Sequence, residues 1–113
     1  IDFQDLNVGP MGMDLASLLY EHDFDYPEDL INELLQKHCE RNGLGLNAKD
    51  ADILTKQVLT HRSMRCVALL NDFNKQGKLL NRKDDIDKFI KRIHLGLSSL
   101  KFTDEIHIIE KLL

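Results

Sequence analysis

The spacing of apolar residues constrains the fold of this chain more than any other feature. From Met13 onward they recur at intervals of three and four residues, which is the period of an α-helix, and no alternating strand pattern follows Phe3. This spacing predicts an all-α fold. The clearest stripe has apolar residues at i, i+3, i+4, i+7, i+11 and i+14: Ile86, Phe89, Ile90, Ile93, Leu97 and Leu100.

Start and stop signals divide the chain into about five helices. Pro27, followed by acidic residues, favours the start of a helix, and Gly43 favours its end. Asn47 can cap the next helix, with Asp50 as the acidic residue of a capping box three positions later. Between Met64 and Leu70 only Arg65 interrupts small or apolar residues, which predicts a helix in the middle of the domain. The expected helices are Met13 to about Tyr20, Pro27 to about Asn42, Ala48 to about Asn74, Asp84 or Asp85 to Leu100, and Thr103 to the last residues.

Composition narrows the class of protein. A chain of 113 residues with 42% hydrophobic content suits a single helical domain, 1–113. The 15 basic and 19 acidic side chains are interspersed and leave a net charge of −4, which argues against nucleic acid and anionic membrane as partners. Cys39 and Cys66 lack a Cys-x-x-Cys spacing, so we expect reduced core thiols. With no apolar run of about 20 residues and no leader-like opening, we expect a cytoplasmic protein.

Two segments carry a family resemblance. The first is Ile1-Asp2-Phe3-Gln4-Asp5, then Gly9-Pro10, then Asp14-Leu15-Ala16-Ser17-Leu18-Leu19. This order resembles the aminoglycoside phosphotransferase family, with the nearest likeness to the bacterial anomeric kinases of cell-wall amino sugars. The second segment, Arg62-Ser63-Met64-Arg65 through Leu70 and on to Gln76-Gly77-Lys78, is similar to the long C-terminal helix and following turn of that branch. The resemblance implies the C-terminal helical part of a kinase-like lobe, with at most a short strand at 1–3.

The same resemblance implies roles for three carboxylates. Asp2 would bind Mg²⁺ against the phosphates of ATP, because a hard dication prefers carboxylate oxygen. Asp5 would bind a second metal ion, or shape its loop through hydrogen bonds to nearby amides. Asp14 matches the Asp that accepts hydrogen bonds from the backbone of the catalytic loop; the alternative is an acid that complements the helix dipole.

Arg62 and Arg65 are candidate contacts to a sugar or phosphate. They lie three residues apart on a helix and therefore share a face. The otherwise apolar surroundings predict burial, and a buried arginine needs a partner. A structural ion pair with a carboxylate such as Asp14 or Glu21 is the alternative. The five histidines are scattered without metal-ligand spacing, so we expect structural roles for them.

Departures from the family pattern shape the functional expectation. No Gly-rich loop, strand lysine or His-x-Asp-x-x-x-x-Asn loop precedes Asp2, and Met13 replaces an aromatic residue. We therefore expect a fragment that is inactive by itself, with no Mg²⁺ or ATP bound beyond an affinity of about millimolar. The parent would transfer the γ-phosphoryl group of ATP to a hydroxyl of a small molecule. The resemblance favours an amino sugar, and the alternative acceptors are an aminoglycoside, a choline-like amine and a homoserine-like alcohol. We also expect self-association through an N-terminal seam around Phe3, Val8, Met11 and Met13. A free-standing helical module for protein interaction is the alternative function.

Overall fold

The computed structural model describes residues 12–20, 25–43, 45–78 and 82–112. In these ranges it contains five α-helices and no strand, which confirms the all-α prediction. The short strand expected at 1–3 lies outside the described residues. The helices are α1 (Met13–Tyr20), α2 (Glu28–Asn42), α3 (Ala48–Lys75), α4 (Lys83–Ser99) and α5 (Thr103–Leu112).

Local capping explains the ends of α2 and the start of α3. The amide of Gly43, in the left-handed conformation at φ 55°, donates to the carbonyl of Cys39, so the helix stops where a glycine allows it. Asn47 Oδ1 accepts the amide of Asp50 at 2.8 Å, as predicted for the α3 cap. Pro27 lies one residue before α2 rather than inside it, and its carbonyl accepts the amide of Ile31.

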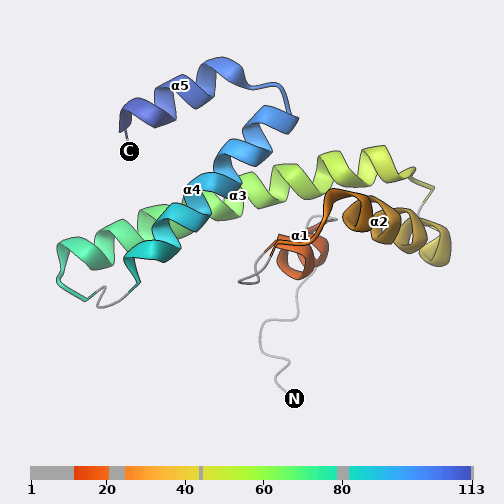
Figure 1. Cartoon of the computed structure of the whole chain (residues 1–113), viewed down its shortest axis with the longest axis horizontal. Coiled ribbons are helices and arrows are strands. Elements are labelled where there is room, and N and C mark those ends of the chain that lie inside the picture. The colour runs from red at the N-terminus through yellow and green to blue at the C-terminus, as the bar shows by residue number, and fades with distance from the viewer. Residues whose placement is uncertain (1–11, 21–24, 44, 79–81, 113) are drawn as a thin grey trace.

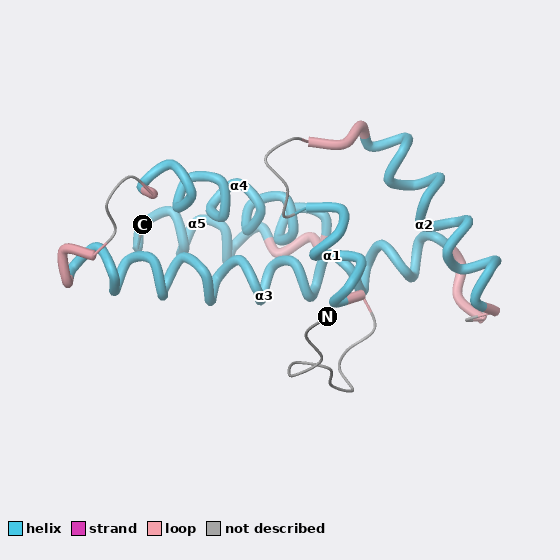
Figure 2. Tube along the Cα trace, turned by 90° about the horizontal axis from the view of Figure 1, so that it is seen from below, coloured by secondary structure: helices cyan, strands magenta, loops and turns pink. Residues whose placement is uncertain are grey.

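Helix α3 is the longest element, and the other helices are arranged along it. At about 1.5 Å per residue its 28 residues span roughly 42 Å. Figure 1 shows α1 and α2 against the N-terminal half of α3, while α4 crosses α3 and α5 folds back over α4. Figure 2 shows the same helices along α3 in a second view. The radius of gyration, 15.5 Å, exceeds the value of about 13 Å typical of a compact domain of this size.

The apolar side chains form two clusters on different parts of α3. The first joins α1, α2 and the start of α3: Leu19, Ile31, Leu35, Cys39 and Ala51. The second joins α3 and α4, with partly buried residues of α5 packed against it: Val67, Ile93 and Leu97. Because each cluster is small, α3 connects two modest cores instead of lying inside one large core.

Between the two clusters, α3 buries small and polar residues where other segments approach closely. Thr55, Thr60 and Ser63 are buried, and the two threonine hydroxyls donate to carbonyls four residues earlier at 2.7 Å. Gly96 of α4 faces this surface: a Cβ there would lie 1.8 Å from Thr60 Oγ1. Gly12, at φ 97°, approaches the α3 backbone at Thr55 in the same way. These small residues therefore set the distance between neighbouring segments.

Several burial predictions were wrong, because α3 is covered on one face only. Met64 is 37% exposed and Leu69 54% exposed, so the second half of α3 is not buried all round. On α4, Ile93 and Leu97 are buried, but Phe89 and Ile90 are only partly buried against them. Cys66 is only half-buried, whereas Cys39 is a core thiol, as predicted. On α5, Ile106 and Ile109 are partly buried against the second cluster.

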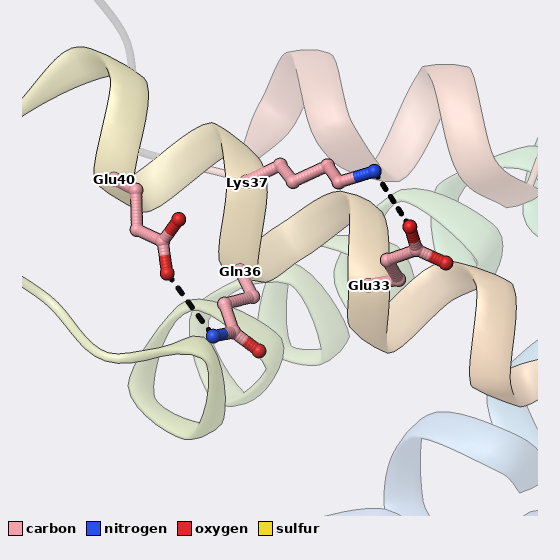
Figure 3. Close-up of polar contacts among 4 residues, drawn as sticks. All are labelled: Glu33, Gln36, Lys37 and Glu40. Atoms are coloured by element: carbon pink, nitrogen blue, oxygen red, sulfur yellow. Dashed lines mark hydrogen bonds and ion pairs between the residues drawn. The ribbon is translucent and has the colours of Figure 1, made fainter.

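The outer face of α2 carries a ladder of polar contacts. Lys37 Nζ donates to Glu33 Oε1 at 2.6 Å, and Gln36 Nε2 donates to Glu40 Oε1 at 3.0 Å (Figure 3). All four residues are exposed and spaced at i and i+4, which is the spacing of side-chain neighbours on a helix. The bond from Lys37 lowers the pKa of the Glu33 carboxyl. This ladder marks the solvent face of α2, opposite Leu35.

Candidate functional site

A cleft of about 470 Å³ lies between the end of α1, the segment leading into α2, and one face of α4. Tyr20 and Tyr26, the only two tyrosines of the chain, both line it. Leu19 and Ile31 extend into it from the first apolar cluster. The cleft therefore combines an apolar base with aromatic and charged walls, which is typical of sites for small molecules.

The α4 wall of the cleft is basic. Lys88, Lys91 and Arg92 line it at positions i, i+3 and i+4, so the helical period directs all three to one side. Lys88 Nζ lies 3.9 Å from Asp85 Oδ1, and the Arg92 guanidinium lies 5.1 Å from the centre of the Phe89 ring. The apolar stripe of α4 faces α3, so these cations occupy the edge of the helix next to the cleft.

Lys56 of α3 brings a buried charge to the same cleft. It is 7% exposed, and its Nζ lies 3.4 Å from Asp52 Oδ1 and 5.5 Å from the centre of the Tyr20 ring. The carboxylate and the aromatic face together compensate a charge that would be costly alone. Lys56 thus contacts Tyr20 at the wall of the cleft.

Burial raises the pKa of the Tyr20 hydroxyl above its usual value of 10, and the positive charge of Lys56 opposes this shift in part. The hydroxyl is therefore protonated near neutral pH. A protonated phenol can donate a hydrogen bond to an oxyanion or accept one from a hydroxyl. Asp25 and Glu28, both exposed, supply carboxylates to the cleft from the segment leading into α2 and its first turn.

The residues predicted from the sequence lie elsewhere or outside the described ranges. Asp2 and Asp5 are not among the described residues. Asp14 lies in the first turn of α1 and is exposed, as a residue that complements the helix dipole would be. Arg62 and Arg65 are both exposed, so the expectation that they are buried was wrong. Neither arginine lines the cleft.

The N-terminal seam can be followed only in part. Phe3, Val8 and Met11 lie outside the described residues, while Met13 is 41% exposed.

Among the described helices, none combines the length and apolarity needed to cross a membrane. Within the same residues, no three His, Cys, Asp or Glu side chains gather in a way that could hold a metal ion.

Comparison of the chain with protein-family models, curated proteins and solved structures found no match. Sequence reasoning missed the cleft because its lining comes from four separate segments. In the sequence, the cleft is indicated only by three basic residues that helical spacing places on one side of a helix, Lys88, Lys91 and Arg92. The same spacing is typical of an ordinary solvent-exposed helix face.

Proposed function

We propose that this chain is the C-terminal helical part of an ATP-dependent phosphotransferase whose acceptor is a hydroxyl of a small molecule, an amino sugar. The observation that carries the proposal is the order of the opening motif: Ile-Asp-Phe-Gln-Asp, Gly-Pro, then Asp-Leu-Ala-Ser-Leu-Leu. Its second half forms α1, which buries Ala16 and Leu19 against the helical body. That half of the motif is thus an integrated part of the fold.

The proposed roles follow from the chemistry of phosphoryl transfer. The Asp2 carboxylate would hold Mg²⁺ beside the β- and γ-phosphates, with Asp5 as a second metal ligand or a loop-shaping residue. Asp14 would support the catalytic loop. The exposed Arg62 and Arg65 would contact acceptor or phosphate only where another segment of the parent covers that face of α3. Such catalysis depends mainly on positioning, so the 113 residues alone should show no turnover.

The test uses the gene product that includes the residues encoded before Ile1. We expect phosphate transfer from ATP to an amino sugar, and we expect Asp2→Asn to reduce turnover by more than about tenfold, or roughly 1.4 kcal/mol. The amide keeps the shape of the side chain and removes the charge that holds the metal. The measurement is transfer of labelled phosphate at saturating magnesium, with Asp104→Asn on the exposed surface of α5 as the matched control.

A smaller effect of Asp2→Asn would show that Asp2 is not the metal ligand. Absence of transfer to every amino sugar tried, together with an upstream sequence lacking a Gly-rich loop, a strand lysine and a His-x-Asp loop, would overturn the proposal. For the 113 residues alone, we expect Mg·ATP to bind no more tightly than about millimolar.

One observation favours the alternative of a helical interaction module. An apolar groove of about 350 Å³ runs between α3 and α5, lined by Met64, Phe102 and Ile108. These three residues are 37%, 47% and 58% exposed. Apolar grooves of this kind can accept an amphipathic helix. The Asp2→Asn comparison separates the two functions, because phosphate transfer by an interaction module joined to another domain would not depend on the Asp2 carboxylate.

A further inference from the structure

We propose that α5 and the apolar grooves beside it form a contact between two copies of this chain, in which the two α5 helices pack antiparallel about a two-fold axis near Ile108. The inference is carried by exposed apolar side chains on α5 that are bordered by an acid and a base along one edge of the helix. It does not rest on the phosphotransferase proposal, because no residue given a catalytic or binding role there lines these grooves.

Helix α5 has little cover within the chain. Among the described helices, its principal packing partner is α4. Of its described side chains, only Ile106 and Ile109 are half-buried, against the second apolar cluster. A helix of 10 residues is marginal in water by itself and depends on packing for its stability. The helix therefore gains stability from a surface that covers its outer side.

This outer side borders two apolar grooves that join into one surface. The groove of about 350 Å³ described above and a second groove of about 310 Å³ share Met64 of α3 and Ile109 of α5. The second groove extends to Leu112, which is 78% exposed. In Figure 1, α5 lies at the edge of the molecule, on the side away from α1 and α2. A second molecule can therefore reach this surface without meeting α1 or α2.

The exposed residues of α5 are ordered by the helical period. Ile108 and Leu112, at i and i+4, lie on the same outer side of the helix. Asp104 and Lys111, at i and i+7, are close to two turns apart and lie along one edge of that side. All four residues are exposed. This edge of α5 is therefore acidic in its first turn and basic in its last turn.

Such a distribution of charge fits a second α5 that runs in the opposite direction. In a two-fold symmetric contact the same patch of both copies meets, so that residue i contacts residue j and residue j contacts residue i. With the axis near Ile108, Asp104 of each copy lies beside Lys111 of the other, and the two Ile108 side chains meet. Both ion pairs form together, and the two helix dipoles are antiparallel. The surface is thus complementary to itself, which favours a second copy over a helix from another protein.

We expect a weak dimer. A contact made by one short helix and its groove buries less than about 1,200 Å² in total, which is typical of transient complexes. Glu105 lines the first groove and would lie near Leu112 of the other copy, so the affinity is reduced by desolvation of its carboxylate. We expect a dissociation constant of about 100 µM. The chain is then mainly monomeric at the low-micromolar concentrations used for denaturation.

Sedimentation equilibrium between about 5 and 500 µM tests the contact, since dimers accumulate with concentration by mass action. We expect the mass to rise from that of a monomer toward that of a dimer and no further. Ile108→Glu places a carboxylate at the two-fold axis and should weaken association at least about tenfold. The matched control is Leu69→Glu on α3, where the side chain is 54% exposed against 58% for Ile108 and lines neither groove. It should change association less than about twofold.

An exchange of charges tests the antiparallel register. Asp104→Lys alone and Lys111→Asp alone each bring like charges together in a dimer of identical copies, so each should weaken association at least about fivefold. An equimolar mixture of the two variants should associate within about twofold of the unaltered chain, because the mixed dimer regains both ion pairs. Damage to α5 itself would persist in the mixture. The recovery therefore distinguishes a lost contact from a misfolded helix, also where circular dichroism shows that Ile108→Glu is misfolded.

Several outcomes would overturn the proposal. A mass that stays monomeric over the whole concentration range is the first, and equal losses in Ile108→Glu and Leu69→Glu are the second. Association that is lost in Met13→Glu but kept in Ile108→Glu would place the contact at the N-terminal seam. A mixture of the two charge variants that stays monomeric would exclude the antiparallel register. Finally, the gene product that includes the residues encoded before Ile1 should also dimerise, because a monomer would mean that another part of the parent covers the grooves.

Discussion

Replacing Ile93 with alanine is expected to lower the free energy of unfolding by about 2 to 5 kcal/mol. Ile93 is 1% exposed and belongs to the second apolar cluster, together with Val67 of α3 and Leu97 of its own helix. Removal of three carbon atoms there leaves a cavity that neither helix can fill without moving. Denaturation by urea, followed by circular dichroism, measures the change.

The control for Ile93 is Ile108→Ala on α5, where the side chain is 58% exposed. It should change stability by no more than about 0.5 kcal/mol. Phe89→Ala should lower the free energy of unfolding by less than the same substitution at a fully buried phenylalanine, because the Phe89 ring is only partly buried. Equal effects at Ile93 and Ile108 would contradict the packing of α4 on α3.

Gly96→Ala is expected to destabilise the fold by about 1 to 3 kcal/mol, although alanine favours helix more than glycine does. The added Cβ would lie 1.8 Å from Thr60 Oγ1 and 3.3 Å from the carbonyl oxygen of Lys56. Thr60 cannot turn away freely, because it is buried and its hydroxyl donates to that same carbonyl at 2.7 Å. Helix α4 must therefore move away from α3, which thermal unfolding will detect.

A double-mutant cycle tests the cause of this loss. Thr60→Ala removes the atom nearest to the new Cβ, so Gly96→Ala should cost less in that background, with a coupling of about 0.5 to 3 kcal/mol. Ser98→Ala, on the exposed side of α4, should be nearly neutral. Strict additivity of the Thr60 and Gly96 substitutions would mean that the two helices do not meet at these residues.

The helices themselves were largely predictable, because their signals are local. Apolar spacing located all five, and the residues that end them act through their own backbone or side chain. Asn47 caps α3 by accepting the amide three residues away, and Gly43 ends α2 because a residue without a Cβ adopts φ 55° without strain. The bounds of α2 and α4 differ from prediction by one or two residues.

The burial pattern and the cleft were not predictable, because they depend on how separate helices meet. A composition rich in apolar residues could not show that α3 is covered on one face, which leaves Met64 and Leu69 exposed. In the sequence, nothing distinguishes Lys56 from an ordinary surface lysine. Its burial is explained only by the contacts with Tyr20 and Asp52 in the folded structure. In the sequence, Gly96 is only a residue of low helix propensity, and its close approach to Thr60 is visible only in the structure.

The arrangement of the helices along α3 has a consequence for the order of folding. The principal packed pairs are α1 with α3, α2 with α3, α3 with α4, and α4 with α5, so each partner is at most two elements away in the chain. Only seven residues, 76–82, connect α3 to α4, so bringing these two helices together costs little entropy. Contacts of low sequence separation are associated with rapid folding. The hairpin of α3 and α4 can therefore nucleate first, and α1 and α2 then dock on a helix that is already formed.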